Sequence, residues 1–278
     1  MSFLLKSQLW LAEGIAQALP PGDAFEAAMA LRGELFRDMP GRKTMRVWLG
    51  GRAYFIKQHF GVGWVEILKN LASGKMPILG ADTEWQAIHR LHALGISTMT
   101  AVGFGSRGLN PATRRSFLLT EDLGNIISLE DFCRDWATNP PPLHLKRQLL
   151  AAVAHIARTL HENGLNHRDF YLCHFCLDAQ RLAAGEVCLY LLDLHRMGIR
   201  RPISPAARMK DMAALYFSAM DIGLSMRDCL RFLRLYRSRA LREVLVREAA
   251  FWQQVSQRAD MLYVKYQERF VGLPKTKR

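Results

Sequence analysis

The sequence predicts an α+β protein with two lobes, for two reasons. Strand patterns dominate the first part of the chain, where residues 44–49 and 52–57 flank Gly50-Gly51, a pair typical of a two-residue hairpin turn. Helical periodicity dominates from residue 128 to the end, with a buried strand expected at 187–192. We therefore expect a small β-rich N-lobe with one main helix and a larger, mostly helical C-lobe.

The two patterns meet at the segment Glu121–Gly124. We accordingly expect the N-lobe to comprise residues 1–122 and the C-lobe residues 123–278, as parts of a single domain. The chain has 278 residues, half of them hydrophobic, which is enough for a sizeable core in each lobe.

Charge restricts the class of partner. Lys and Arg number 38 against 25 Asp and Glu, a net charge of +13. Such a chain favours polyanions, which include phosphorylated substrates, an anionic membrane surface, nucleic acid and acidic proteins. We identify no basic groove interleaved with aromatic residues, so nucleic acid is not an expected partner.

Cysteines and apolar runs indicate the compartment. The five cysteines are odd in number and irregularly spaced, which argues against a secreted disulfide framework and for a reducing compartment. No uncharged apolar stretch approaches the roughly 18 residues that a membrane helix needs. The protein is expected to be soluble, or held at a membrane surface from outside.

The remaining elements follow from local patterns. Residues 1–20 indicate an amphipathic segment, and residues 25–37 fit either a helix or a strand. A helix is expected from an N-cap at Asp82, or alternatively Thr83, to Leu94, with Glu84 on its apolar face. The other expected elements are short helices at 65–71 and from Ser128, a strand at 116–120, a long helix at 144–163, and helices from Met209 onward.

The tripeptide His167-Arg168-Asp169 is the first candidate for chemistry. In protein kinases such a tripeptide opens the catalytic loop, and its Asp accepts the proton of the attacking hydroxyl. Alone it is weak evidence, because a surface turn after a helix is the more common explanation of such a tripeptide. Its weight depends on whether the other parts of a kinase site occur in the right order.

Those parts do occur in order. Lys57 closes the strand Tyr54-Phe55-Ile56-Lys57, where a kinase places the lysine that binds the nucleotide phosphates. Glu84 on the next helix is suited to pair with it, since a carboxylate on an inward face needs a partner. A solvated lysine and a glutamate favoured by the helix dipole are the plainer alternatives.

Two further carboxylates complete the series. Asp193 follows the buried strand at 193 − 169 = 24 residues beyond the proposed base, where kinases place their main magnesium ligand. Asp211 resembles the helix-borne Asp that braces the catalytic loop, together with His167 and Arg168 as structural support. The order of these residues predicts a protein-kinase-like two-lobed fold with ATP and Mg²⁺ as cofactors.

The sequence departs from the kinase pattern at two places. No Gly-x-Gly-x-x-Gly precedes Lys57, so residues 40–44 with Gly41 are the only candidates to cover the phosphates. His174 occupies the position of the usual Asn ligand, and imidazole suits softer metals than magnesium. His174 is therefore a doubtful metal ligand, with a packed histidine as the alternative. Glu121 and Leu123, between the lobes, are the remaining expected ATP-binding residues.

Several stretches resemble the lipopolysaccharide core heptose(I) kinases of Gram-negative bacteria. The matching stretches are Met76-Pro77-Ile78-Leu79-Gly80-Ala81-Asp82, Thr120-Glu121-Asp122-Leu123, Ser128-Leu129-Glu130-Asp131, Asp135-Trp136-Ala137-Thr138-Asn139-Pro140-Pro141, Asn166-His167-Arg168-Asp169, Cys173-His174-Phe175, Leu192-Asp193-Leu194-His195-Arg196 and Leu215-Tyr216-Phe217-Ser218. The resemblance runs from about Phe25 to past residue 240 and makes His174 and Asp-Leu-His family features.

The resemblance implies transfer of the ATP γ-phosphate to O4 of the first heptose of the inner core. It also implies a lipid A–core acceptor, a place at the cytoplasmic face of the inner membrane, and a link to acyl carrier protein. Basic residues crowd the segment after Asp193, and we expect Arg196, Arg200 and Arg201 among them to bind the anionic acceptor.

Two other interpretations stay open at this point. One is a kinase of the same fold with another acceptor, such as protein tyrosine or a different sugar, although no Ala-Pro-Glu follows Asp193. The other is a non-catalytic basic binding scaffold, which the missing glycine loop and His174 favour. The complete set of Lys57, Glu84, Asp169 and Asp193 argues against a scaffold.

Overall fold

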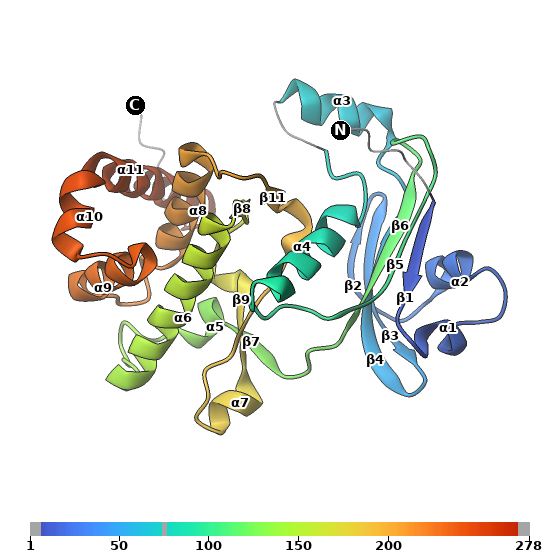
Figure 1. The fold of residues 1–278 in the computed structure, drawn as a ribbon, viewed down its shortest axis with the longest axis horizontal. Coiled ribbons are helices and arrows are strands. Elements are labelled where there is room, and N and C mark those ends of the chain that lie inside the picture. The colour runs from blue at the N-terminus through green and yellow to red at the C-terminus, as the bar shows by residue number, and fades with distance from the viewer. Residues whose placement is uncertain (1–6, 74–76, 272–278) are drawn as a thin grey trace. The chain divides into compact units, whose positions relative to one another are not determined.

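The computed structural model describes residues 7–73 and 77–271. The chain forms two compact units, each with its own sheet and helices (Figure 1). The first unit runs to Gly124 and includes Leu194–Arg196, and the second comprises Asn125–Asp193 and the chain from Met197. The first is β-rich and the second mostly helical, so the predicted α+β fold is confirmed.

A six-stranded antiparallel sheet forms the first unit, in the order β1-β5-β6-β4-β3-β2. Its strands are β1 (Gln8–Leu11), β2 (Glu34–Met39), β3 (Arg42–Leu49), β4 (Arg52–His59), β5 (Ala101–Arg107) and β6 (Arg115–Glu121). On β3 every second residue from Met45 to Leu49 is buried, as the two-residue period of a strand with one covered face requires. The same face packs against Phe25 of α2 (Ala24–Ala30), so the core lies between the sheet and α2.

The predicted hairpin is present between β3 and β4. Gly50 and Gly51 both have positive φ, 55° and 78°, which matches the mirror-image turn that suits the twist of two paired strands. The second strand is longer than expected: it continues through Lys57 to His59, because Gln58 and His59 pair with β6. Lys57 therefore lies inside a central strand instead of at its end.

Residues 25–37, which fitted a helix or a strand, contain both α2 and β2. The segment expected to be amphipathic contains β1 and α1 (Ile15–Ala18), and its first six residues lie outside the described residues. The short helix expected at 65–71 is α3 (Gly63–Ala72).

The main helix of the first unit is α4 (Asp82–Ala93), and its buried residues include Glu84, Ile88 and Leu91, as predicted. The predicted N-cap was wrong, because Ala81 occupies that position without a side-chain cap. The Asp82 carboxylate instead binds Arg114, with 2.9 Å between Oδ1 and Nη2. The short helix η2 (Leu194–Arg196) packs against α4 with Leu194 buried.

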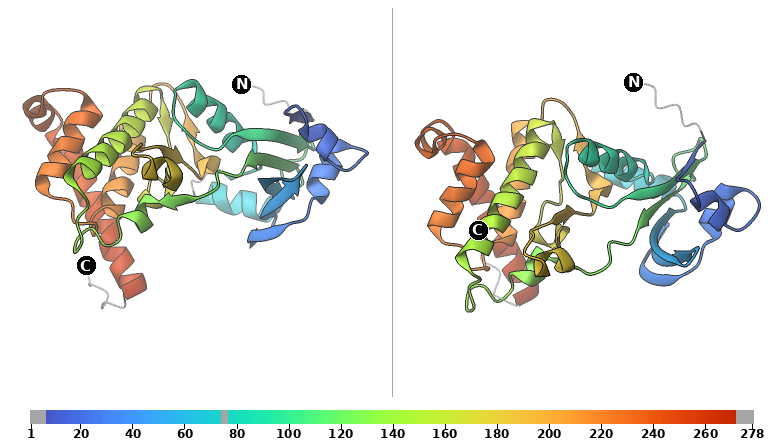
Figure 2. Two further views of the ribbon diagram at one scale, coloured as in Figure 1. Left: turned by 90° about the horizontal axis from the view of Figure 1, so that it is seen from below. Right: turned by 60° about the horizontal axis from the view of Figure 1, so that its bottom comes forward.

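Helices form most of the second unit. They are α5 (Leu129–Phe132), α6 (Leu143–Glu162), α7 (Ala179–Ala183), α8 (Pro205–Ser218), α9 (Met226–Arg237), α10 (Leu241–Arg247) and α11 (Ala249–Tyr266). The apolar stripe of α6 is buried, as its spacing predicted, and α6 packs against α9 while α8 packs against α11. Figure 2 shows this group, coloured green to red, from two further sides.

The second unit also contains short strands, which lie in the segments between these helices. Strands β7 (Ile126–Ser128), β9 (Phe175–Asp178) and β10 (Leu189–Leu191) form one sheet, and β8 (Leu165–Asn166) pairs with β11 (Gly198–Ile199). The expected strand at 187–192 is β10. Among residues 7–73 and 77–271, no helix is both long and apolar enough to cross a membrane.

Candidate active site

The first unit holds an ion pair between the sheet and α4. Nζ of Lys57 on β4 lies 2.5 Å from Oε1 of Glu84 on α4, so the predicted pairing is present. The Glu84 side chain is 1% exposed and that of Lys57 is 19% exposed. A buried carboxylate is tolerated only with such a partner, and the pair fixes the lysine at one place on the sheet.

Gly41 lies in the turn between β2 and β3, with a φ of 77°. Its carbonyl accepts a hydrogen bond of 2.9 Å from the backbone N–H of Phe60, just beyond β4. The turn that the sequence predicts to cover the phosphates is thus attached next to the end of the strand that carries Lys57. Arg42 follows directly and begins β3.

Glu121 and Leu123 lie at the end of β6 and in the residues that follow it. The backbone N–H of Glu121 donates to Thr100, and its carboxylate lies 3.5 Å from Arg52. Between them, Asp122 binds Arg46 and accepts from the backbone N–H of Gly124. These contacts hold the segment in a defined conformation at the end of the first unit.

In the second unit, Asp211 on α8 holds the segment that follows β8. Its Oδ2 accepts from the backbone N–H of His167 at 2.7 Å, and its Oδ1 accepts from that of Arg168 at 2.9 Å. The Asp211 side chain is fully buried, at 0% exposed. Both oxygens of one carboxylate therefore fix two successive peptides immediately before Asp169.

Two residues that sequence reasoning missed extend this brace. His161 on α6 lies with Nε2 3.3 Å from Oδ2 of Asp211 and with Nδ1 2.7 Å from the hydroxyl of Tyr236 on α9. Burial, opposed in part by Arg208 and Arg237, raises the pKa of Tyr236, so its hydroxyl stays protonated. A histidine on the apolar stripe of α6 was the one sequence signal for this network.

His167 connects the same segment to the strand before Asp193. Its Nε2 donates to the carbonyl of Leu192 at 2.9 Å, while Nδ1 is buried without a partner among the described residues. Burial is the main cause that lowers the pKa of His167, so the imidazole is neutral with its proton on Nε2. The segments that carry Asp169 and Asp193 are therefore joined directly.

His174, at the end of the short helix Leu172–His174, contacts both carboxylate-bearing residues. Its Nδ1 lies 2.6 Å from the backbone oxygen of Asp169, and its Nε2 lies 3.5 Å from Oδ2 of Asp193. A carbonyl oxygen only accepts, so Nδ1 must carry a proton. The other nitrogen then faces a carboxylate, an arrangement that is favourable with a proton on Nε2 or with a cation bound by both groups.

The backbone is strained at the same place. Arg168 and Asp193 have φ values of 72° and 60°, in the left-handed region that non-glycine residues rarely adopt. Strain of this kind is typical of functional sites, where the surrounding contacts compensate for it.

The basic residues after Asp193 fall into two groups. Arg196 is exposed at the end of η2 in the first unit, and Arg200 and Arg201 are exposed just beyond β11 in the second. The guanidinium of Arg201 binds the backbone and side-chain oxygens of Asn163, at 3.0 and 2.5 Å, at the end of α6. Arg201 thus caps a helix, a structural role that the sequence did not indicate.

The donor set for a metal ion is small. Within the described part of the chain, no group of three or more His, Cys, Asp and Glu side chains converges in metal-binding geometry. The candidate ligands are the carboxylate of Asp193 and the imidazole of His174, whose Oδ2 and Nε2 lie 3.5 Å apart. Magnesium keeps several waters and takes substrate phosphate oxygens, so one carboxylate ligand fits its usual coordination.

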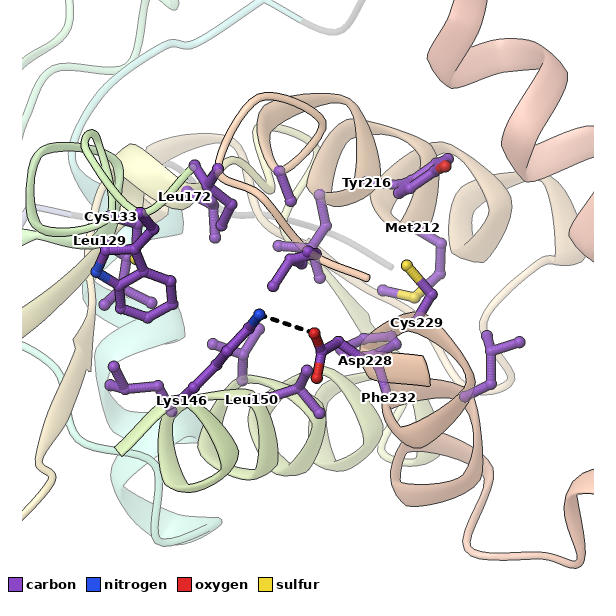
Figure 3. A pocket seen from close by; sticks show the side chains of 18 of the residues that line it. Leu129, Cys133, Lys146, Leu150, Leu172, Met212, Tyr216, Asp228, Cys229 and Phe232 are labelled. Carbon is purple, nitrogen blue, oxygen red and sulfur yellow. Dashed lines mark ion pairs between the residues drawn. The ribbon is translucent and has the colours of Figure 1, made fainter. Parts of the chain in front are cut away.

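A separate apolar cavity lies within the second unit (Figure 3). It has a volume of about 260 Å³ and is lined by residues of α5, α6, α8, α9 and α11. Lys146 and Asp228 form an ion pair in its wall, with 2.8 Å between Nζ and Oδ2. Burial raises the pKa of Asp228, but hydrogen bonds from Lys146 and Ser225 outweigh it and leave the value at about 2.

Comparisons with known proteins agree with this geometry. The sequence profile of the lipopolysaccharide kinase (Kdo/WaaP) family matches residues 26–236. The lipopolysaccharide core heptose(I) kinase WaaP of Pseudomonas aeruginosa is 49% identical over 246 residues, which cover 88% of this chain and 92% of that protein. The protein of that name from Escherichia coli K12 is 45% identical over 260 residues, covering 93% and 98%.

A solved structure is similar as well. WaaP in complex with acyl carrier protein matches with a TM-score of 0.80 and 44% sequence identity, covering 92% of this chain and 99% of that one. The family match over residues 26–236 includes the predicted site residues from Gly41 to Asp211. A β-sheet unit with the Lys57–Glu84 pair and a helical unit with the braced Asp169 segment are what a kinase-like fold requires, and the chain belongs to the lipopolysaccharide kinase (Kdo/WaaP) family.

Proposed function

We propose that this chain is an ATP-dependent kinase that phosphorylates O4 of the first heptose of the lipopolysaccharide inner core. The observation that carries the proposal is an identity of 45–49% with three core heptose(I) kinases, over at least 86% of this chain. The two units act as the lobes of one domain, residues 1–122 and 123–278.

Asp169 is the catalytic base in this proposal. It accepts the proton of the acceptor hydroxyl as that oxygen attacks the γ-phosphorus of ATP. The backbone hydrogen bonds from His167 and Arg168 to Asp211 support this role, because they hold the segment in place before the acceptor arrives. Positioning of this kind is a large part of kinase catalysis.

Lys57 binds the nucleotide phosphates, and Glu84 orients it. The ion pair of 2.5 Å supports this assignment, since it keeps the ammonium group at a fixed point on the sheet. The turn at Gly41 covers the phosphates with its backbone N–H groups. Glu121 and Leu123 contribute to the adenine site from the end of β6.

Asp193 holds Mg²⁺, and His174 assists it. Magnesium, when bound with the nucleotide, neutralises charge on the transferring phosphoryl group. The contact between His174 and Asp193 supports a shared role, because a nitrogen and a carboxylate at 3.5 Å suit a cation between them. His174 also fixes the Asp169 backbone through Nδ1, which is a positioning role.

The acceptor is the lipid A–core saccharide, whose phosphates and carboxylates are anionic. We assign its recognition to Arg196 and Arg200, with Arg201 retained as a contributor although its guanidinium also caps α6. The net charge of +13 supports an anionic acceptor. It equally supports a peripheral location on the cytoplasmic face of the inner membrane, where that acceptor lies.

Acyl carrier protein is the proposed protein partner, since a relative of 44% identity is known in complex with it. The basic charge of this chain and the apolar cavity of the second unit support the proposal. An apolar cavity of about 260 Å³ suits a hydrocarbon chain of the kind such a carrier holds. Binding of the acylated and the unloaded carrier, compared for the wild type and a cavity-filling Leu215→Trp variant, tests this.

The phosphotransfer assay uses γ-labelled ATP, Mg²⁺ and lipopolysaccharide that lacks core phosphate, with Asp169→Ala as the comparison. We expect label in the lipopolysaccharide with the wild type only. Label in protein or in another sugar would identify a different acceptor for the same fold. Nucleotide binding without any transfer, even with acyl carrier protein added, would indicate a non-catalytic scaffold.

A further inference from the structure

Helix α3 (Gly63–Ala72) presents an apolar face to solvent. Trp64, Val65, Leu68 and Leu71 are between 51% and 82% exposed, and Ile67 is the one buried residue of the helix. At 3.6 residues per turn these four side chains lie on one continuous stripe. Soluble surfaces rarely gather four large apolar side chains on one short helix without a binding partner.

The polar residues of α3 occupy the opposite side and bind one another. The side-chain amide of Asn70 donates to the carboxylate of Glu66 at 2.8 Å, and Lys69 lies 3.9 Å from the same carboxylate. The helix is therefore amphipathic along its whole length, with its polar groups satisfied locally. Within the described part of the chain, no other residues cover its apolar stripe.

The start of α3 is fixed to the sheet. The backbone N–H of Gly63 donates to the carbonyl of Ala112, in the turn between β5 and β6, at 2.9 Å. Gly61 has a φ of 89°, and a Cβ there would lie 2.6 Å from the same carbonyl oxygen, so the close approach requires glycine. Figure 1 shows α3 at the end of the sheet where this turn lies. The exposed stripe is thus held in a defined position.

Basic residues flank the segments that form this attachment. Arg42 and Lys43 follow the turn that contacts Phe60, Arg114 follows Ala112, and Lys69 lies one turn beyond Val65. Three of the four are paired with carboxylates, Lys43 with Asp38, Lys69 with Glu66 and Arg114 with Asp82, but the chain as a whole carries a net charge of +13. An apolar helical stripe on a strongly basic chain suits a helix that lies in the interface of an anionic membrane.

We propose that α3 is a membrane-docking helix, which inserts Trp64, Val65, Leu68 and Leu71 into a bilayer of anionic phospholipid. The choice of a bilayer as occupant rests on the proposed function, because a lipid-linked saccharide acceptor is itself embedded in one. The indole of Trp64 suits the headgroup region, where one edge of the ring stays hydrated. The inserted helix holds the enzyme at the surface that presents the acceptor.

The test measures binding of the full chain to sedimentable vesicles of phosphatidylethanolamine and phosphatidylglycerol that contain no lipopolysaccharide. The wild type is expected to bind, and Val65→Gln with Leu68→Gln is expected to lower the partition coefficient by about tenfold or more, since two large apolar side chains no longer leave water. The matched control is Met226→Gln with Val246→Gln, two apolar side chains in the second unit that are 73% and 72% exposed.

Trp64 provides a second readout. Brominated lipid quenches tryptophan fluorescence at the membrane interface, and the quenched component is expected to be lost in Trp64→Phe. Thermal unfolding and far-UV circular dichroism identify any variant that fails to fold. If the double variant does not fold, the fluorescence quenching of the wild type and Trp64→Phe tests the proposal without it.

Three results would overturn the proposal. These are no vesicle binding by the wild type, equal binding by the α3 variant, or an equal loss in the control. A wild-type dimer in the absence of lipid, abolished by the α3 substitutions, would identify a second copy of the chain as the occupant instead. The vesicle assay does not depend on phosphotransfer. Absence of kinase activity would refute the proposed function, and the vesicle assay would still test membrane docking by α3.

Discussion

The imidazole of His174 binds the backbone of Asp169, with 2.6 Å between Nδ1 and the carbonyl oxygen. Its other nitrogen lies 3.5 Å from the carboxylate of Asp193. One side chain thus fixes the segment of the proposed base and faces the proposed metal ligand. An Asn at this place would keep both functions, since its amide N–H₂ donates and its oxygen binds magnesium.

This relationship predicts different outcomes for two substitutions. His174→Asn should keep kcat within about tenfold of the wild type, whereas His174→Ala should lose about 10- to 100-fold because both contacts disappear. The Mn²⁺-to-Mg²⁺ activity ratio should fall in His174→Asn, since an oxygen ligand suits the harder ion. Steady-state rates over a range of each metal measure both effects. Equal losses in the two variants, with an unchanged metal preference, would show that His174 only packs.

Lys57 and Glu84 predict a double-mutant result. Lys57→Met leaves a carboxylate that is 1% exposed without its partner, which should cost about 3–5 kcal/mol of unfolding free energy. Adding Glu84→Gln removes the unpaired charge and should restore most of that stability. Kinase activity should stay low in the double variant, because the cation on the phosphates is still missing. Denaturant unfolding and phosphotransfer, measured on the same three proteins, separate the structural from the catalytic part.

The contact between Tyr236 and His161 predicts that Tyr236 helps to position the segment before Asp169. Tyr236→Phe removes the hydroxyl that lies 2.7 Å from Nδ1 of His161, and the loss of one buried hydrogen bond should cost about 1–3 kcal/mol. Because His161 also contacts Asp211, the backbone of Arg168 should become more mobile. Amide hydrogen exchange at Arg168 and Asp169 is expected to speed up, and kcat to fall with KM for ATP unchanged. Met226→Leu, on the same helix and 73% exposed, is the comparison variant.

The candidate site residues could be predicted from the sequence, but the residues that contact and brace them could not. Lys57 lies on a strand, and Glu84 and Asp211 lie on helices, that local periodicity indicates. Asp169 follows the predicted long helix, and Asp193 follows the predicted buried strand. The contact between His161 and Tyr236 joins residues 75 positions apart, on two helices whose packing no local pattern specifies. For the same reason the apolar cavity, which helices from five places in the chain enclose, had no sequence signal.

Strand β5 shows why part of the sheet was missed. Residues 101–107 contain Gly103 and Gly105, which lower strand propensity and weaken the alternation that a sequence pattern needs. A Cβ on Gly105 would lie 2.4 Å from the ring of Phe117 and 2.9 Å from that of Phe25. Glycine is required there by two aromatic rings from other elements, so tertiary packing decides what local preference opposes.

His59 predicts how stability responds to acid. It is buried at the end of β4, and burial above all, together with Arg42, Lys57 and His195, lowers its pKa to about 3. The unfolded chain has a histidine pKa near 6.5, so between about pH 6.5 and pH 3 the unfolded state binds a proton that the folded state does not. The free energy of unfolding should therefore fall as pH falls through this window, by at most about 1.4 kcal/mol per pH unit for this group.

His167 also makes the free energy of unfolding fall as pH falls, because its pKa in the folded protein is lowered, mainly by burial. Urea unfolding of the wild type between pH 7.5 and pH 4.5 measures the combined slope. His59→Asn should be less stable at neutral pH and should show a shallower slope, since one of the two protons is no longer taken up on unfolding. A control at an exposed histidine, His89→Asn, should keep the wild-type slope. An unchanged slope in His59→Asn would mean that His59 binds its proton in the folded protein, which its burial among cationic side chains argues against.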